Sequence, residues 1–146
     1  MNIFMAEALK QAKIAFDQDE VPVGCVIVEN RKIIAASHNN NLFLNDPTAH
    51  AEISALRIAS EIKKSSRLDN CDIYVTLEPC TMCAAAISLA RIKRIYYAAS
   101  DSKFGAVENG VKFFHSSSCF HQPEIYSGIS ETESKKLIVD FFKSKR

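Results

Sequence analysis

Short β-prone runs alternate with helix-length segments in the middle of the chain, and this alternation constrains the fold more than any other feature. Residues 50–60 and 80–90 form helix-length, alanine-rich segments, whereas 72–76 and 94–98 are rich in β-branched and aromatic residues. Strands joined by helices pair in parallel, with the helices covering the sheet. We therefore expect part of a parallel sheet between residues 50 and 98.

The segments before residue 50 predict a helix followed by a hairpin. Apolar residues first recur at helical spacing, and two β-prone runs then stand on either side of a short polar connection, Glu29-Asn30-Arg31. The expected elements are a helix over 5–16 that ends near 17–20, strands over 23–28 and 32–36, and a loop over 37–46. An antiparallel hairpin next to parallel strands predicts a mixed sheet.

The last third of the chain is less regular. Residues 124–126 predict a short fifth strand and residues 131–142 a terminal helix, whereas 100–123 predict no element. Linkers, repeats and shifts in composition are absent from the sequence. We therefore expect a single domain spanning residues 1–146.

Charge and cysteine usage limit the partners. Eighteen Lys and Arg against seventeen Asp and Glu give a net charge of +1, so contact with nucleic acid must be local. The apolar-leaning run from Cys80 to Ala90 is too short for a membrane helix, and the first residues lack the basic start of a signal peptide. Five cysteines cannot all pair in disulfides. We expect a cytoplasmic protein with reduced thiols and no membrane segment.

Two short strings carry candidate chemistry: His50-Ala51-Glu52 and Pro79-Cys80-Thr81-Met82-Cys83. Each stands at the start of a predicted helix, and such helix starts gather at the carboxyl edge of a parallel sheet. One imidazole and two thiolates can therefore meet. Three nitrogen and sulfur ligands suit a catalytic zinc ion, since the fourth position is left for a reacting water. Cys80 and Cys83 share one face of a first helical turn, where the helix dipole favours thiolates.

Glu52 has a role in such a site because of its chemistry. A carboxylate beside a zinc-activated water can take its proton and deliver it to the substrate. Residues two apart in mid-helix point roughly opposite ways, so His50 and Glu52 reach one site only if His50 lies at the opening edge of the helix.

The main alternative is a closed structural zinc site. Its fourth ligand would be Cys71, His115, Cys119 or His121. This interpretation leaves Glu52 unexplained. The remaining candidates favour ordinary roles: His38, His115 and His121 in loops, Cys25 in the core, and packing for the pairs Phe113-Phe114 and Phe141-Phe142.

The two strings match the established signature of the zinc-dependent nucleobase and nucleoside deaminases, His-x-Glu followed by Pro-Cys-x-x-Cys. Among these enzymes the chain most resembles the bacterial tRNA-specific adenosine deaminases. The strings that carry this likeness are Val21–Gly24, Asn45–Glu52 and Tyr74–Cys83. The likeness is close from Glu20 to Gly105 and resumes at Asp140–Phe142.

The resemblance implies a three-layer α/β/α cytidine-deaminase-like fold, in which a five-stranded mixed sheet has helices on both faces. It implies hydrolysis of the wobble adenosine of a tRNA anticodon to inosine and ammonia by a homodimer with one zinc ion (Zn2+) per subunit. In that reaction His50, Cys80 and Cys83 hold the zinc, hydroxide formed at the zinc is the nucleophile, and Glu52 shuttles protons.

The resemblance also assigns residues to the substrate. Asn39 would hydrogen-bond the purine and the backbone of Ala51 would contact it, while Asp101 and Lys103 match a loop near the flipped nucleotide and Phe142 an aromatic near the RNA surface. The implied partner is the anticodon stem-loop, whose bases are cheaper to extrude than those of a duplex.

Three basic clusters could contact phosphates: Lys63, Lys64 and Arg67; Arg91, Lys93 and Arg94; Lys143, Lys145 and Arg146. We favour the terminal cluster because it follows Phe142, whereas the first is typical of a solvated surface. The chain departs from the family at residues 120–123, where Phe-His-Gln-Pro replaces a common Asn-His-Arg run. This difference concerns the RNA contacts rather than the zinc chemistry.

Two other functions fit part of the pattern. Deamination of free cytosine, cytidine or guanine would use the same zinc site, although the likeness around Asn39 and from Asp101 to Phe142 favours tRNA. A noncatalytic RNA-binding module stabilised by zinc predicts instead that Glu52→Ala leaves every function intact.

Overall fold

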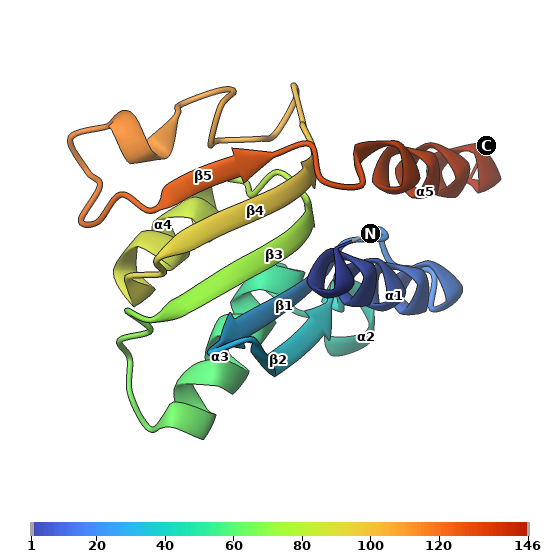
Figure 1. The fold of residues 1–146 in the computed structure, drawn as a ribbon. Helices are drawn as coiled ribbons and strands as arrows, with labels where there is room; N and C mark the ends of the chain where they lie inside the picture. Colours follow the sequence, from blue (N-terminus) through green and yellow to red (C-terminus); the bar gives the residue numbers. More distant parts are fainter. Residues whose placement is uncertain (1, 146) are drawn as a thin grey trace.

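A five-stranded mixed sheet lies between two layers of helices in the computed structural model, which describes residues 2–145 (Figure 1). The strands are β1 (Gly24–Glu29), β2 (Lys32–His38), β3 (Cys71–Leu77), β4 (Arg94–Ala99) and β5 (Glu124–Ser127), arranged in the order β2-β1-β3-β4-β5. β1 is antiparallel to both neighbours, whereas β4 is parallel to both β3 and β5. The expected mixed sheet is confirmed.

Helices cover both faces of this sheet. They are α1 (Ile3–Asp17), α2 (Asn41–Leu44), α3 (Ala51–Lys63), α4 (Thr81–Ala90), α5 (Glu131–Ser144) and a short 3-10 turn, η1 (Phe113–His115). α3 and α4 pack on one face, α1 packs on the other, and α5 lies beside α1 at one end of the sheet (Figure 1). The three-layer α/β/α arrangement is confirmed. Within residues 2–145, every helix is too short or too polar to cross a bilayer.

Two crossovers place the starts of α3 and α4 at the same edge of the sheet. β2 and β3 run in the same direction, because each is antiparallel to β1 between them, and α3 connects them. α4 connects β3 to its parallel neighbour β4. Both helices therefore begin beyond the carboxyl ends of strands, which is where open α/β sheets commonly bind ligands.

The hairpin between β1 and β2 is tighter than the sequence predicts. Glu29 pairs with Lys32, so the connection has two residues rather than three. Asn30 and Arg31 have positive φ angles of 50° and 63°, the conformation of a type I′ turn. That turn fits the twist of the two strands even without the favoured Asn-Gly pair.

The strand residues alternate between two apolar clusters. On β1, Cys25 and Ile27 face the helices α3 and α4, whereas Val26 and Val28 face the α1 side. Cys25 is completely buried, which confirms its expected place in the core. Because side chains on both faces of β1 are buried, residues 25–28 are apolar throughout rather than alternately apolar and polar.

The expected loop over residues 37–46 is only partly correct. It contains the four-residue helix α2, and β2 extends two residues beyond its expected end. The start of α2 is held by the buried carboxylate of Glu20, which accepts hydrogen bonds from the N–H groups of Leu42 and Phe43 at 3.0–3.1 Å. The negative charge stabilises a helix start from 22 residues away, and local propensity does not reveal it.

Residues 100–123 are irregular, as expected, apart from η1. The residues of the pairs Phe113-Phe114 and Phe141-Phe142 differ in burial. Phe114 and Phe141 are buried, whereas Phe142 is 48% exposed on α5. The expected packing role is therefore confirmed for Phe114 and Phe141, and Phe142 presents half of its surface to solvent.

Gly24 is the position where the packing of α1 on β1 leaves no room for a side chain. A Cβ atom there would lie 1.9 Å from the backbone oxygen of Ala8 and 2.5 Å from the backbone nitrogen of Ala12. We expect Gly24→Ala to lower the free energy of unfolding by roughly 3 kcal/mol, because helix backbone must move. Urea denaturation measures this loss, and an unchanged midpoint would contradict the packing.

Candidate active site

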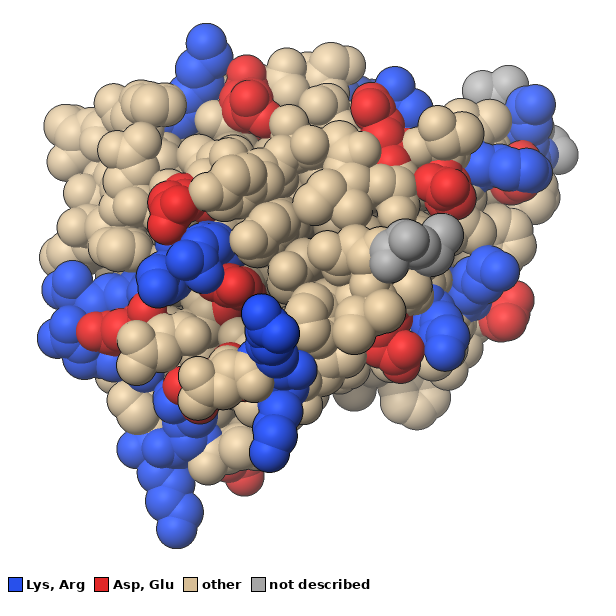
Figure 2. Space-filling model, viewed as in Figure 1, with Lys and Arg blue, Asp and Glu red and all other residues tan. Residues whose placement is uncertain are grey.

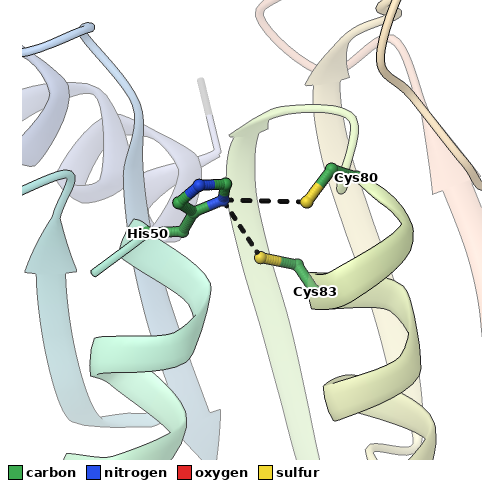
Figure 3. A group of neighbouring side chains, drawn as sticks. All are labelled: His50, Cys80 and Cys83. Carbon is green, nitrogen blue, oxygen red and sulfur yellow. Dashed lines mark hydrogen bonds between the residues drawn. The ribbon is translucent and has the colours of Figure 1, made fainter. Parts of the chain in front are cut away.

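Three side chains converge at the edge where α3 and α4 begin. Among the described residues, His50, Cys80 and Cys83 form the one group of three or more potential metal ligands, and their ligand atoms all lie within 4.8 Å of one another. His50 Nδ1 is 3.7 Å from Cys80 Sγ and 3.5 Å from Cys83 Sγ (Figure 3). An imidazole nitrogen and two thiol sulfurs at these separations fit a metal ion.

Helix starts position all three groups. His50 is the N-cap of α3 and Cys80 the N-cap of α4, both with extended backbone angles, and Cys83 lies in the first turn of α4. The His50 side chain makes no capping hydrogen bond to its own helix. The expected helix from residue 50 begins one residue later, at Ala51, which leaves His50 at the opening edge as a shared site with Glu52 requires.

The two cysteines differ in their protonation. Hydrogen bonding from Cys83 and the nearby His50 outweigh burial and lower the pKa of Cys80 to about 4. The hydrogen bond to Cys80, together with burial and the negative charge of Glu52, raises the pKa of Cys83. The lowered pKa favours the deprotonated form of Cys80. A divalent metal would favour the deprotonated form of both sulfurs.

Glu52 is a buried carboxyl group beside the three potential metal ligands. It lies in the first turn of α3 with 4% of its surface exposed. Burial raises the pKa of Glu52 to about 7; the charge of Cys80 also raises it, whereas His50 lowers it. A carboxyl group that titrates near neutral pH is suited to accept and return a proton.

The residues proposed as a fourth zinc ligand lie outside the group. Cys71 is at the start of β3, near Glu29, whereas Cys80 follows the other end of that strand. Cys119 lies against Ser88, His121 Nε2 contacts the backbone oxygen of Ile92 at 2.9 Å, and His115 is exposed. The potential ligand set within residues 2–145 therefore has three members, as an open metal site needs.

Asn39 joins the end of β2 to the start of α3. Its Oδ1 accepts a hydrogen bond from the N–H of Ala51 at 2.8 Å. The residue expected to bind a purine therefore lies next to His50 and Glu52. The backbone of Ala51 is expected to contact the substrate, and its N–H donates to Asn39 in this structure.

Asp101 and Lys103 lie in the loop after β4. The side chain of Asp101 accepts from the N–H groups of Lys103 and Phe104 at 3.0 Å each. Gly105 of the same loop forms a β-bridge with Cys80, which brings this loop alongside the ligand group. Phe142 is separate: it lies on α5, and its ring packs edge-on against Phe141.

Three residues of the first two basic clusters are paired with acids. Arg67 pairs with Asp69 at 3.0 Å, and Lys63 pairs with Glu29. Arg94 lies 3.4 Å from both Asp72 and Glu124. These positions fit a solvated surface. Figure 2 shows basic side chains gathered with acidic ones at the end of the molecule that contains the β1–β2 hairpin.

The described cations of the terminal cluster, Lys143 and Lys145, are both exposed, and one of them is paired. Lys145 pairs with Asp19 and lies 5.2 Å from the ring centre of Phe141. Lys143 is exposed near the end of α5, and Arg146 lies outside the described residues.

Sequence reasoning missed Glu78 and Gly105. Glu78 is 3% exposed and accepts hydrogen bonds from the loop after β4. Burial would raise the pKa of Glu78, but hydrogen bonds from Asp101, Val107, Glu108 and Asn109 lower it overall. The available signal is the charge itself: Glu78 is the one carboxylate between an apolar strand and the Pro79-Cys80 string.

Comparisons with known proteins identify the class of this fold and site. A family model described as MafB19-like deaminase matches residues 1–146. The chain belongs to this deaminase family.

Within that class, the chain is similar to curated tRNA-specific adenosine deaminases. The chain is 54% identical to the one from Agrobacterium fabrum over 143 residues, covering 98% of this chain and 94% of the relative. It is 57% identical to the one from Rickettsia felis over 141 residues, covering 95% and 98%.

Solved structures agree. A chain from work on A-to-I editing by tRNA:A34 deaminases at the wobble position of transfer RNA has a TM-score of 0.92 and 53% identity, covering 94% of this chain and 99% of that one. A guanine deaminase from Nitrosomonas europaea shares the fold, with a TM-score of 0.81 at 19% identity over 94% of this chain and 82% of its own.

Proposed function

We propose that this protein hydrolyses adenosine to inosine at the wobble position of a tRNA anticodon, with one zinc ion per subunit. The observation that carries the proposal is the convergence of His50, Cys80 and Cys83 beside the buried carboxyl group of Glu52. The relatives named tRNA-specific adenosine deaminase support the substrate.

The donor set fits zinc. One imidazole and two sulfurs stand at two helix N-termini, where negative charge is stabilised, and the pKa of Cys80 is lowered. His50, Cys80 and Cys83 would hold the ion, which when bound would activate a water molecule at neutral pH.

Glu52 moves the protons in this proposal. Its carboxylate accepts a proton from the attacking water and passes it to a purine ring nitrogen as the oxygen bonds to the amino-bearing carbon. The same carboxylate then takes the remaining proton from the new hydroxyl group and delivers it to the amino group, so that a C=O bond forms, the C–N bond breaks and ammonia leaves. A pKa near neutrality lets one group perform both transfers.

The substrate must present a base that has left its stack. Asn39 would hydrogen-bond the purine, and its own hydrogen bond to Ala51 fixes its position. Backbone contact from Ala51 and the loop with Asp101 and Lys103 would complete the contacts near the base, while Phe142 on α5 would contact RNA further away. A loop nucleotide suits such a site because extruding it costs little.

A homodimer and a cytoplasmic location belong to the same proposal. A protein with a net charge of +1 lacks a general attraction for RNA, so a second subunit would enlarge the local contact surface. Sedimentation of the protein alone would measure homodimer formation, and sedimentation with an anticodon stem-loop would measure RNA binding.

Substrate choice tests the proposal. We expect zinc-loaded protein to produce inosine from a stem-loop with adenine at the wobble position, and to leave free adenosine, cytidine and guanine unchanged. Ammonia release and nucleoside analysis measure this. Turnover of a free base without the stem-loop would agree with the zinc chemistry and contradict the assignment of RNA as the substrate.

A further inference from the structure

Glu78 is a buried carboxylate to which the proposed reaction gives no task. It stands directly after β3 and two residues before Cys80, with 3% of its surface exposed. Its carboxylate accepts hydrogen bonds from the N–H groups of Asp101 (3.0 Å), Val107 (3.0 Å), Glu108 (2.9 Å) and Asn109 (3.2 Å), and from Asn109 Nδ2 (2.7 Å). Five donors on one carboxylate make it the centre of this loop.

The donors lie at both ends of the loop, so Glu78 connects the two ends. Oε1 accepts from the Asp101 N–H at the start of the 101–109 segment and from Asn109 Nδ2 at its end, and Oε2 accepts from the backbone N–H groups of residues 107–109, so both ends are held by one side chain. Hydrogen bonds to an ionised group are the stronger kind. Glu78 therefore holds the two ends of the loop, while Asp101 holds residues 103–105 within it.

The loop packs against the turn that carries Cys80. The Ala106 N–H donates to the Pro79 oxygen at 2.9 Å, and Gly105 forms a bridge with Cys80. A Cβ atom on Gly105 would lie 2.5 Å from the carboxyl carbon of Glu78, so the loop backbone passes directly against the carboxylate. This contact fixes the loop relative to the metal-ligand group.

The held loop presents a cation and an aromatic ring to solvent. Phe104 is 65% exposed, and Lys103 Nζ lies 5.2 Å from the centre of its ring. Asp101 fixes the backbone beneath both of them. Exposed aromatic rings stack on unpaired bases and lysines contact phosphates, which is the pairing that single-stranded RNA loops accept.

We propose that Glu78 is a positioning residue that presents Lys103 and Phe104 to the RNA loop, an inference that rests on the proposed function. A loop already ordered before binding loses little conformational entropy when RNA arrives. Without the carboxylate, the four backbone donors have no common acceptor, and the two exposed side chains lose their fixed place beside Cys80.

Glu78→Gln tests this role, because an amide of the same size directs its own N–H groups at donors. We expect stem-loop affinity, measured by fluorescence anisotropy, to fall roughly tenfold to a hundredfold. Zinc content should stay at one per subunit, and faster hydrogen exchange should be confined to the amides of residues 101 and 107–109. Glu29→Gln is the control, since Glu29 pairs with Lys63 at the far end of the sheet.

A double-mutant cycle separates positioning from general stability. Replacing both Lys103 and Phe104 with alanine should weaken RNA binding, and adding Glu78→Gln should weaken it little further. Independent, multiplying effects would overturn the proposal, as would wild-type affinity in Glu78→Gln.

A second variant covers the case in which Glu78→Gln does not fold. Gly105→Ala displaces the loop from the carboxylate without changing its charge, and it should lower stem-loop affinity in the same way. If the wild-type protein deaminates only free bases and does not bind the stem-loop, the proposed function itself fails. If the wild type binds and neither variant is weakened, only the role of Glu78 fails.

Discussion

Replacing Glu52 with glutamine is expected to abolish deamination while leaving the fold and the bound zinc in place. The amide keeps the size of the side chain but cannot take a proton from water or return it to the purine. We expect kcat on the stem-loop to fall by roughly 10²- to 10⁴-fold. Inosine formation under single-turnover conditions measures this loss.

The control for Glu52 lies on the same helix. Glu61 is an exposed residue of α3, so Glu61→Gln should retain full activity. Zinc content and thermal melting of both variants should match the wild type. Full activity in Glu52→Gln would contradict the enzymatic account and favour a noncatalytic RNA-binding module.

Replacing Cys80 with serine is expected to remove the metal and the activity together. The hydroxyl group of serine does not supply the thiolate that Cys80 provides, and its loss leaves one imidazole and one sulfur. We expect deamination to fall by roughly a thousandfold or more, because metal activation supplies the nucleophile at neutral pH. Metal analysis and ammonia release measure the two losses.

The fold should survive that change. The core consists of apolar residues of the sheet packed against α1, α3 and α4, and this packing does not depend on the ligand group. Chelation of the wild type should therefore abolish activity before it unfolds the protein. Cys119→Ser, at a half-buried thiol outside the group, is the control. Simultaneous loss of metal and fold on chelation would favour a structural zinc site.

Much of the sheet could be predicted because its signals are local. The β-prone runs from Gly24 to Glu29 and from Cys71 to Leu77 are apolar enough to require burial on both faces. The alternation of strands and helices predicts the parallel pairing of β3 with β4 that the structure shows. That topology is also what brings His50 within reach of Cys80, 30 residues away.

The parts that could not be predicted depend on distant charges. The four-residue helix α2 is stabilised at its start because the carboxylate of Glu20 accepts hydrogen bonds from its free N–H groups. Residues 101–109 have no periodic pattern, and their two ends are held by hydrogen bonds to Glu78, more than 20 residues earlier. Hydrophobic periodicity carries no information about such contacts. Both carboxylates hold segments at the candidate site, so sequence analysis found its reactive groups and missed their supports.

Mapping inosine in a full-length tRNA transcript tests the central claim most directly. Zinc-loaded wild-type protein is incubated with a transcript that has adenosine at the wobble position, and with a matched transcript in which that adenosine is moved one position along the anticodon loop. The account predicts inosine at the wobble position of the first transcript and none in the second. Equal conversion at both positions, or no conversion in either, would contradict it.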